Sequence, residues 1–311
     1  MSQAVRPLSP KLQKIAIEEL NEDPLKIPGF LYDFKNWIKE QKYLHVRHDD
    51  DQFLIQFLRA SRYDLQEAEK KLDYFHAFRT RYPEFFETNV DSPKVRATHE
   101  LGVTVPLPTP LNDCGSRIVV YRYTYDPNRW RMEDLAPVCT AMHELMILND
   151  PYACICGLTY ILDMSQANMQ HILQYTPSMV KKIALFYEKW MPLNMKGFYF
   201  INVHPGVELV ATLFMNALSK ELQEKVFICG KDLSKIADRI PLKYLPKEYG
   251  GENGSLTSIV QDYHNIWNEN REYFRENRKY GTDEALRPGG KLLDFDGQLK
   301  EEFSLKDTQF D

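Results

Sequence analysis

The sequence predicts an α/β protein, with a mostly parallel sheet and flanking helices preceded by an all-helical N-terminal part. Residues 10 to about 85 carry helical patterns only. From residue 117 onward, short runs of β-branched and aromatic residues alternate with longer helical patterns. Because parallel strands need a long crossover, usually a helix, this alternation is typical of βαβ units.

Capping signals define the two clearest helices of the N-terminal part. Asp51 is expected to cap a helix, and Asp64 with Glu67 resembles the capping box of a second one, which ends at Pro83. The residues expected to face inward are Phe53, Leu54, Phe57 and Leu58, then Leu65, Ala68, Leu72 and Phe75.

Four runs in the second part are predicted to be strands. They are 117–123, 157–164, 197–203 and 226–230. The helix that follows the second strand should begin at Thr176, with Pro177 at its first position. The proline-rich segment 105–115 is predicted to be a link between the two parts.

Residues 204–226 form an unusual helical pattern. One face carries Val207, Val210, Ala211, Phe214, Leu218 and Leu222, and Leu209, Leu213 and Met215 add apolar groups elsewhere. A helix that is apolar nearly all round is either buried or in contact with something apolar. About 12 apolar residues are too few to span a bilayer.

Composition bounds the class of protein. The chain is 43% hydrophobic and 27% charged, as in soluble globular proteins, and its net charge of −5 argues against bulk nucleic-acid binding. No signal peptide or membrane-spanning run is recognisable. The five cysteines form no CxxC pair, so free thiols in a reducing cytoplasm are expected.

The sequence lacks the common signatures of enzyme chemistry. It has no GxSxG elbow, no Walker loop and no GxGxxG after a strand, so no enzyme and no cofactor is expected. Residues 45–51 (HVRHDDD) suggest a solvated helix start more strongly than a metal site. Asp163 ends a strand, where a turn role is favoured over a ligand role. His143 is equally compatible with a hydrogen-bonded core and with a pocket.

Three stretches together resemble the CRAL-TRIO lipid-binding family, in particular its tocopherol-transfer and retinaldehyde-binding branches. They begin FLIQFLRASRYDLQEAEKKLDYF at residue 53, YILDMSQANMQHILQYTPSMVKK at residue 160, and IPLKYLPKEYGGE at residue 240. The resemblance covers about residues 50–255. It implies a helical N-terminal domain over 1–90, a lipid-binding domain over 91–280 and a polar tail over 281–311.

The resemblance also implies a lipid cavity between the sheet and its helices, closed by a mobile gate helix at about 206–222. The ligand-binding residues expected from the match are Tyr123, Cys139, His143, Tyr160, Leu162, Ile183, Phe186, Tyr187, Met195, Phe198, Phe214 and Leu218. Cys139 and His143 replace serines of the family, and Phe186 and Tyr187 replace smaller residues. These differences imply another ligand shape.

In some relatives a basic cleft beside the gate binds phosphoinositides, and this chain departs from that pattern. Ser61, Asn194 and Glu221 stand in place of basic residues, which puts a phosphoinositide partner in doubt. The candidates for contact with an anionic membrane are Arg62, Lys196, Lys220 and Lys225.

The function implied is intracellular binding and transfer of a hydrophobic small molecule, of retinoid, carotenoid or tocopherol type, between membranes. Burying about 500 Å² of apolar surface would hold such a ligand by about 12 kcal/mol, so release requires a gate that opens at a membrane. The alternatives are a phospholipid exchanger, a lipid-sensing adaptor, and an enzyme with His143 or Asp163 as base.

Overall fold

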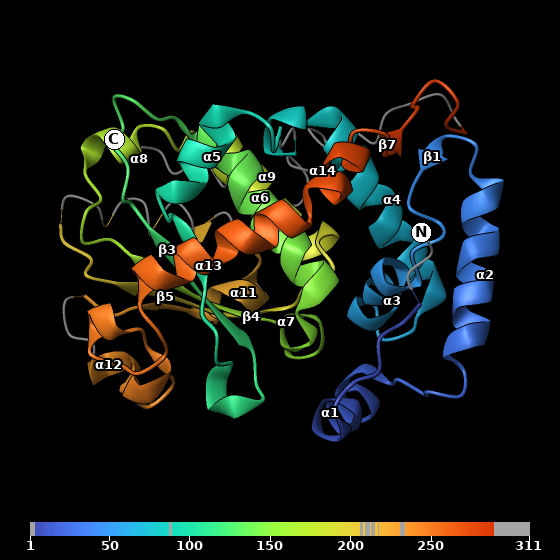
Figure 1. Cartoon of the computed structure of the whole chain (residues 1–311), viewed down its shortest axis with the longest axis horizontal. Coiled ribbons are helices and arrows are strands. Elements are labelled where there is room, and N and C mark those ends of the chain that lie inside the picture. The colour runs from blue at the N-terminus through green and yellow to red at the C-terminus, as the bar shows by residue number, and fades with distance from the viewer. Residues whose placement is uncertain are drawn as a thin grey trace.

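The computed structural model describes residues 4–86, 89–205, 208, 212, 215–216, 218–230 and 234–288. Figure 1 shows the N-terminal helices on one side of the molecule and the sheet on the other. The N-terminal elements are α1 (Pro10–Leu20), α2 (Ile27–Glu40), β1 (Leu44–His45), α3 (Asp51–Ala60), α4 (Leu65–Arg81), η1 (Pro83–Phe85) and α5 (Pro93–Glu100).

The central sheet has five strands in the order β2-β3-β4-β5-β6. Strand β2 is antiparallel to β3, and the other pairs are parallel, which confirms the predicted α/β class. The strands are β2 (Thr104–Pro106), β3 (Arg117–Arg122), β4 (Leu158–Asp163), β5 (Met195–Ile201) and β6 (Val226–Ile228).

Helices and short turns cover both faces of the sheet. On one face lie α6 (Met132–Asn149), α9 (Pro177–Leu185) and η3 (Phe186–Trp190), whose buried side chains share one core with α3 and α4. The opposite face packs on α12 (Ser234–Ala237), η4 (Leu242–Tyr244) and α13 (Leu256–Glu269). The remaining elements are η2 (Leu111–Asp113), α7 (Pro151–Cys156), α8 (Met169–Ile172), α11 (Lys220–Gln223), η5 (Lys247–Tyr249), α14 (Arg271–Asn277) and β7 (Gly281–Thr282).

Three local predictions need correction. The cap of α3 is Asp50, whose carboxylate accepts from Phe53 N at 2.9 Å, while Asp51 is already helical and pairs with Lys35. The proline-rich link contains strand β2, because a sheet edge tolerates Pro106. The two-stranded sheet of β1 and β7 joins residues 44–45 to residues 281–282 and was not predicted.

The described part of the predicted tail packs against the N-terminal helices. Arg287 pairs with Asp73 of α4, its Nη2 lying 2.8 Å from Asp73 Oδ1, and its guanidinium lies 4.2 Å above the ring of Tyr43. Residues 289–311 lie outside the described part of the chain.

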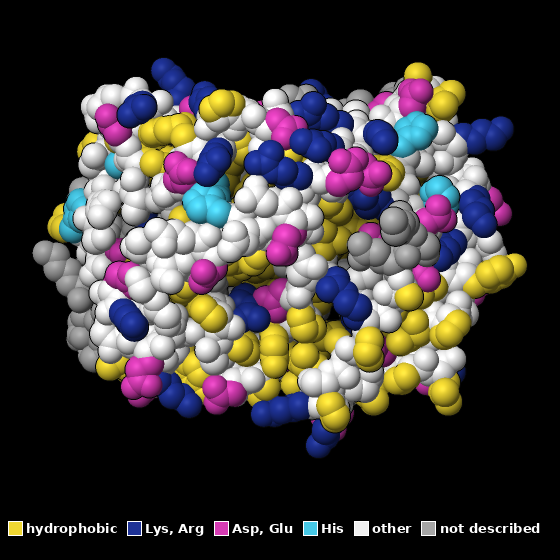
Figure 2. All heavy atoms as spheres, viewed as in Figure 1, with side chains coloured by type: hydrophobic (Ala, Val, Ile, Leu, Met, Phe, Trp, Pro, Cys, Tyr) yellow, Lys and Arg dark blue, Asp and Glu magenta, His cyan; other side chains and the backbone are white. Residues whose placement is uncertain are grey.

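Figure 2 shows the distribution of side-chain types on the face seen in Figure 1. Hydrophobic side chains are concentrated in the lower half of this face, and Lys and Arg side chains gather over α14.

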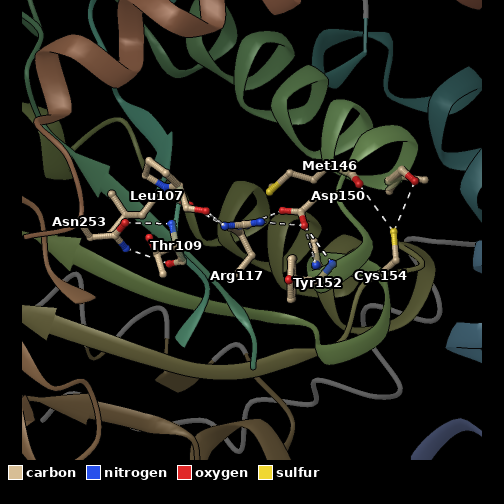
Figure 3. A network of polar contacts seen from close by, with 11 residues as sticks. Leu107, Thr109, Arg117, Met146, Asp150, Tyr152, Cys154 and Asn253 are labelled. Carbon is tan, nitrogen blue, oxygen red and sulfur yellow. Dashed lines mark hydrogen bonds and ion pairs between the residues drawn. The ribbon is translucent and has the colours of Figure 1, made fainter. Parts of the chain in front are cut away.

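A buried arginine joins the edge of the sheet to the helix that precedes β4. Arg117 lies between the Leu107 carbonyl oxygen, 2.8 Å from its Nη1, and Asp150, whose Oδ1 is 3.0 Å from its Nη2 (Figure 3). Asp150 also caps α7, accepting from Tyr152 N at 3.0 Å. Arg117, through its ion pair with Asp150 and its contact with Leu107, therefore holds together the start of β3, the end of the edge strand β2 and the start of α7.

Candidate functional site

An apolar cavity of about 110 Å³ lies between the sheet and the helices α6 and α9. Among the residues that the structure describes, none of those lining it is charged. The lining consists of Phe85, Tyr121, Tyr123, Met132, Ala136, Cys139, Thr140, Tyr160, Leu162, Tyr175, Val180, Ile183, Phe186, Tyr187, Phe198 and Phe200.

The strand contribution to the lining follows from the alternation of side chains along a strand. Tyr121, Tyr160, Leu162, Phe198 and Phe200 face the cavity. Their neighbours in the sequence lie in the core on the opposite face, among them Val120, Ile161, Tyr199 and Ile201. The sheet therefore presents a mostly aromatic floor to the cavity.

Two consecutive residues, Phe186 and Tyr187, reach the cavity from the turn that follows α9. This turn, η3, is π-helical, and Met191 N donates to the Phe186 carbonyl at 2.9 Å, five residues back. Phe186 is 2% exposed and stacks on Phe78 of α4 with a centroid distance of 5.2 Å. The π turn thus connects the cavity wall to the N-terminal helices.

Tyrosine hydroxyls supply much of the polar character of the cavity. The hydroxyls of Tyr121 and Tyr175 lie 2.9 Å apart, so one donates to the other. Burial raises the pKa of both well above the ordinary value and that of Tyr123 to about 12, so all three remain protonated at neutral pH. Such a site offers hydrogen bonds without charge.

His143 lies behind the cavity wall and orients it. The imidazole Nδ1 is 2.6 Å from the Cys139 carbonyl oxygen, to which it donates, and Nε2 accepts from the Tyr160 hydroxyl. Burial lowers the pKa of His143 to about 4, so the ring is neutral at pH 7. Its role here is to position Tyr160.

Cys139 lines the cavity as a protonated thiol. Its Sγ lies 3.1 Å from Thr104 Oγ1, and burial raises its pKa to about 11. A buried protonated thiol is a weak nucleophile, so this position contributes shape and weak polarity.

Eight of the twelve residues expected to bind the ligand line this cavity. They are Tyr123, Cys139, Tyr160, Leu162, Ile183, Phe186, Tyr187 and Phe198. His143, Met195 and Leu218 are buried but are not among the described lining residues, and Phe214 lies outside the described part of the chain. Met195 pairs with Leu158 of β4, and the register between β4 and β5 shifts immediately after this pair. Met195 is therefore not part of the alternating set, Phe198 and Phe200, that faces the cavity.

Periodicity could have found most of the lining residues that the sequence analysis missed. Tyr121 and Phe200 lie two residues from expected strand positions, and Ala136 and Val180 lie three residues from expected helical ones. Met132 and Thr140 also belong to α6, which already contributes Cys139, whereas Tyr175 lies in the connection between α8 and α9. Phe85 comes from η1 after the N-terminal helices, and no local pattern connects it to the sheet.

The segment proposed as the gate is only partly described. Val207, Val210, Ala211 and Phe214 fall outside the described residues, whereas Leu218 and Leu222 are 3% and 6% exposed. Ser219 is extended and caps α11, accepting from Leu222 N at 3.3 Å. Leu222 therefore belongs to a separate short helix, and the predicted continuous helical face is wrong at this point.

The four basic residues expected to contact a membrane do not form one cluster. Lys225 pairs with Glu221 at 2.8 Å, and the pKa of Glu221 is lowered first by that hydrogen bond and further by the charge of nearby Arg62. Lys196 lies instead 4.0 Å from Glu19 of α1. Lys220 is exposed at the start of α11.

Asp163 has a structural role. Its carboxylate accepts from Ser165 N at 3.0 Å, from Asn202 Nδ2 at 2.8 Å and from the Tyr249 hydroxyl at 2.7 Å. These contacts tie the end of β4 to the loop after β5 and to η5. The turn interpretation of Asp163 is confirmed.

Neither a metal-binding cluster nor a membrane-spanning helix is found among the described residues. Within them, no group of three or more His, Cys, Asp or Glu side chains is arranged to hold a metal ion. No helix in that part of the chain is long and apolar enough to cross a membrane.

Comparison with known families decides what kind of protein carries this cavity. Residues 111–251 match the CRAL/TRIO domain, and residues 29–95 match the Pinta-like UBA domain. The segment 111–251 therefore belongs to the CRAL/TRIO domain family. CRAL-TRIO proteins bind and transfer lipids, and the apolar cavity is formed largely within the matched CRAL/TRIO segment.

Curated relatives are distant but cover most of this chain. Clavesin-2 of Rattus norvegicus and of Homo sapiens are each 25% identical over 254 residues, covering 78% of this chain and 75% of the relative. The alpha-tocopherol transfer protein-like protein of Mus musculus is 26% identical over 250 residues, covering 78% and 70%. The crystal structure of Sfh5 has a TM-score of 0.44 at 12% identity, covering 84% of this chain and 99% of Sfh5, a likeness too low to carry an argument.

Proposed function

We propose that this CRAL-TRIO protein binds an uncharged hydrophobic small molecule, of retinoid, carotenoid or tocopherol type, and carries it between membranes inside the cell. The observation that carries the proposal is the cavity lining, which is aromatic and aliphatic, with hydroxyl groups but no charged side chain among the described residues. The name of the mouse relative, alpha-tocopherol transfer protein-like, supports the same ligand class.

The lining favours a small neutral cargo over a phospholipid. A buried phosphate headgroup requires charged or closely paired polar partners, because an unpaired charge in an apolar site is very unfavourable. The described lining offers tyrosine hydroxyls, Thr140 and the thiol of Cys139. These groups suit a hydroxyl or carbonyl group on an otherwise apolar ligand.

The proposal includes release at a membrane through the mobile gate helix expected at about 206–222. The proposed surface for contact with the membrane consists of two exposed apolar side chains beside the cavity. Met169 of α8 and the adjacent Leu173 are 50% and 73% exposed, and the same segment leads to Tyr175 of the cavity wall. Arg62, Lys220 and Lys225 would add attraction to anionic lipid, of about 1 kcal/mol each at most.

The deciding experiment identifies the cargo. Protein purified from its native source is extracted with organic solvent, and the extract is analysed by absorption and mass spectrometry. A stoichiometric polyene or chromanol supports the proposal, and a stoichiometric phospholipid supports an exchanger. An empty extract, with no uptake from liposomes that offer retinoids, tocopherols or phospholipids, contradicts the carrier function.

The membrane contact is tested separately with a transfer assay between donor and acceptor vesicles. The double substitution Met169→Ser and Leu173→Ser should slow transfer of the identified cargo without weakening its equilibrium binding. Leu25→Ser is the matched control, because Leu25 is 92% exposed but lies in the N-terminal part. Equal slowing by the control would contradict a specific contact through α8.

A further inference from the structure

A second cavity, of about 40 Å³, lies outside the lipid cavity, where α5 meets the end of α13 and the start of α14. Its lining consists of Val90, Val95, Arg96, His99, His264, Trp267, Asn268 and Arg271. Within the described part of the chain, every charged side chain of this lining is basic. The same region of α14 carries the gathered Lys and Arg side chains in Figure 2.

Two buried polar atoms of the lining have no hydrogen-bond partner among the described residues. They are Nε2 of His99 and Nε1 of Trp267, on side chains of residues that are 6% and 8% exposed. The two rings are close, with centroids 5.2 Å apart. Since buried polar groups are nearly always paired, these atoms indicate that the cavity holds a hydrogen-bonding occupant.

The chemistry of the two atoms restricts that occupant. The indole of Trp267 can only donate. The His99 imidazole makes a hydrogen bond to the Val260 backbone, while burial, followed by the charge of His264, lowers its pKa to about 4. In the neutral ring that donates to this carbonyl, Nε2 accepts. The occupant must therefore accept one hydrogen bond and donate another.

Two guanidinium groups, each paired with one carboxylate outside the lining, make the cavity favourable for negative charge. Arg271 Nε donates to Asn268 Oδ1 at 3.1 Å, and its Nη1 donates to Asp91 Oδ1 at 3.1 Å. Arg96 Nε donates to Glu100 Oε1 at 3.3 Å. Asp91 and Glu100 are not part of the lining, so the two arginines present positive charge to the cavity and each guanidinium has further N–H donors.

We propose that this cavity binds a phosphoryl group that retains one proton. The second ionisation of a phosphate monoester has a pKa near 6, so around neutral pH part of the population keeps a P–O–H group that can donate to His99. The remaining oxygens accept from Trp267 and from the arginines. Sulfate carries no proton at this pH. A water molecule could pair with both His99 and Trp267 but offers no anionic oxygen to the remaining N–H donors of the two arginines.

The phosphoryl group can belong to a soluble solute or to a lipid headgroup, because the small cavity accommodates only the group itself. The helices that form this small cavity, α5, α13 and α14, contribute none of the described lining residues of the apolar cavity. The proposal therefore does not depend on the identity of the hydrophobic cargo, and its failure leaves the carrier function untouched.

The test uses the indole N–H resonances of the four tryptophans in the full chain. The Trp267 resonance is assigned with Trp267→Phe, and inorganic phosphate is titrated against sulfate at pH 7 and matched ionic strength. Phosphate should shift this resonance saturably, and sulfate should bind about tenfold more weakly because it lacks the donated hydrogen bond. No shift with phosphate, or equal binding of sulfate, overturns the proposal.

A matched pair of variants locates the site. Arg271→Gln should weaken phosphate binding about tenfold through the loss of a charge-assisted contact. Arg275→Gln should leave binding within about twofold, because Arg275 also pairs with Asp91, at 2.8 Å, but does not line the cavity. Equal weakening by both variants would indicate general surface charge and would overturn the assignment.

The two sources of the phosphoryl group are separated with soluble ligands. Short-chain phosphatidic acid presents a phosphate monoester on a lipid, and short-chain phosphatidylcholine presents a diester without the transferable proton. A Trp267 shift, lost in Arg271→Gln, with phosphatidic acid and not with phosphatidylcholine identifies a lipid headgroup site. A shift with inorganic phosphate alone identifies a soluble solute, and a larger shift with phosphatidylcholine overturns the phosphate monoester assignment.

Discussion

At the scale of single residues, neutral histidines are part of the folded core. His143 and His99 have pKa values lowered to about 4 and His76 to about 3, in each case chiefly by burial. Below its ordinary pKa of about 6.5, a histidine in the unfolded chain takes up a proton that the folded chain excludes. The stability that these residues contribute is fully present above pH 6.5 and is lost as pH falls towards 4.

We predict that this effect is measurable for His143. The free energy of unfolding should fall by about 2 kcal/mol between pH 7.5 and pH 5 because of His143 alone. Urea unfolding at both pH values should therefore show a smaller fall for His143→Gln than for the unsubstituted protein. His48→Gln replaces a histidine whose side chain is 54% exposed and should keep the full fall. An unchanged fall in His143→Gln would contradict a neutral buried imidazole.

Single residues also show which features of the two cavities can be predicted from the sequence and which cannot. Tyr160 and Phe198, which the family resemblance placed in the pocket, line the cavity, and the alternation of side chains along a strand accounts for the side of the sheet that they face. His143 was assigned to the pocket but lies behind Tyr160, because helical spacing gives a face and not the depth of a side chain. Trp267 of α13 and His99 of α5 come from separate helices, and no local pattern could bring them together.

At the scale of elements, the π turn η3 connects the cavity to the N-terminal helices. We predict that Phe186→Ala lowers the free energy of unfolding by about 3–5 kcal/mol, since it removes a buried ring and leaves a void. Tyr187→Phe keeps the neighbouring ring and should cost less than about 1.5 kcal/mol. Chemical unfolding checks both, and equal costs would show that the Phe186 ring is not an essential packing element.

A glycine determines where β4 can start. Gly157 has a φ of +79°, and a Cβ there would collide with the backbone oxygen of Asn194 just before β5. Gly157→Ala should therefore destabilise the protein by about 2 kcal/mol or more. Gly29, in the first turn of α2, has no atom near the corresponding position, and Gly29→Ala should be stabilising by up to about 1 kcal/mol. Thermal unfolding of both variants tests the expected opposite signs.

The elements that the sequence predicts well are those with a repeating pattern. Strands β3, β4 and β5 and helix α9 follow from apolar runs and from the cap at Thr176, which accepts from Met179 N at 3.2 Å. Strands β1, β2 and β7 have two or three residues, too few for a period to be recognised. Their pairing depends on segments far apart in the sequence, which local patterns cannot show.

At the scale of the whole molecule, buried ion pairs join the N-terminal helices, α6 and the C-terminal helices. Arg79 of α4 lies 2.9 Å from Glu144 of α6, and Glu144 also accepts from Asn277 of α14 at 2.6 Å. Arg47 extends the network by donating to Glu276 at 3.0 Å. The Arg79–Glu144 ion pair therefore connects the segment that matches the Pinta-like UBA domain with the segment that matches the CRAL/TRIO domain.

A second, separate contact between the C-terminal segment and the N-terminal helices can be tested. Arg287→Met should lower the free energy of unfolding by about 2–3 kcal/mol, since it leaves Asp73 and Glu284 without their common partner in a mostly buried site. Arg278→Met, at an exposed position, should change it by less than about 0.5 kcal/mol. Hydrogen exchange of α4 amides should accelerate in Arg287→Met only, and protection equal to that of the unsubstituted chain would contradict the contact.

The pairing of β1 with β7 has a consequence for biosynthesis. Leu44 pairs with Thr282, and Asp73 with Arg287, so the first helices to leave the ribosome wait for more than two hundred further residues before their contacts are complete. At 5–20 residues per second this delay is on the order of ten seconds or more. During that interval the side of α4 that contacts η3 and β7 in the folded protein stays uncovered, whereas α2 can already pack on α3 and α4.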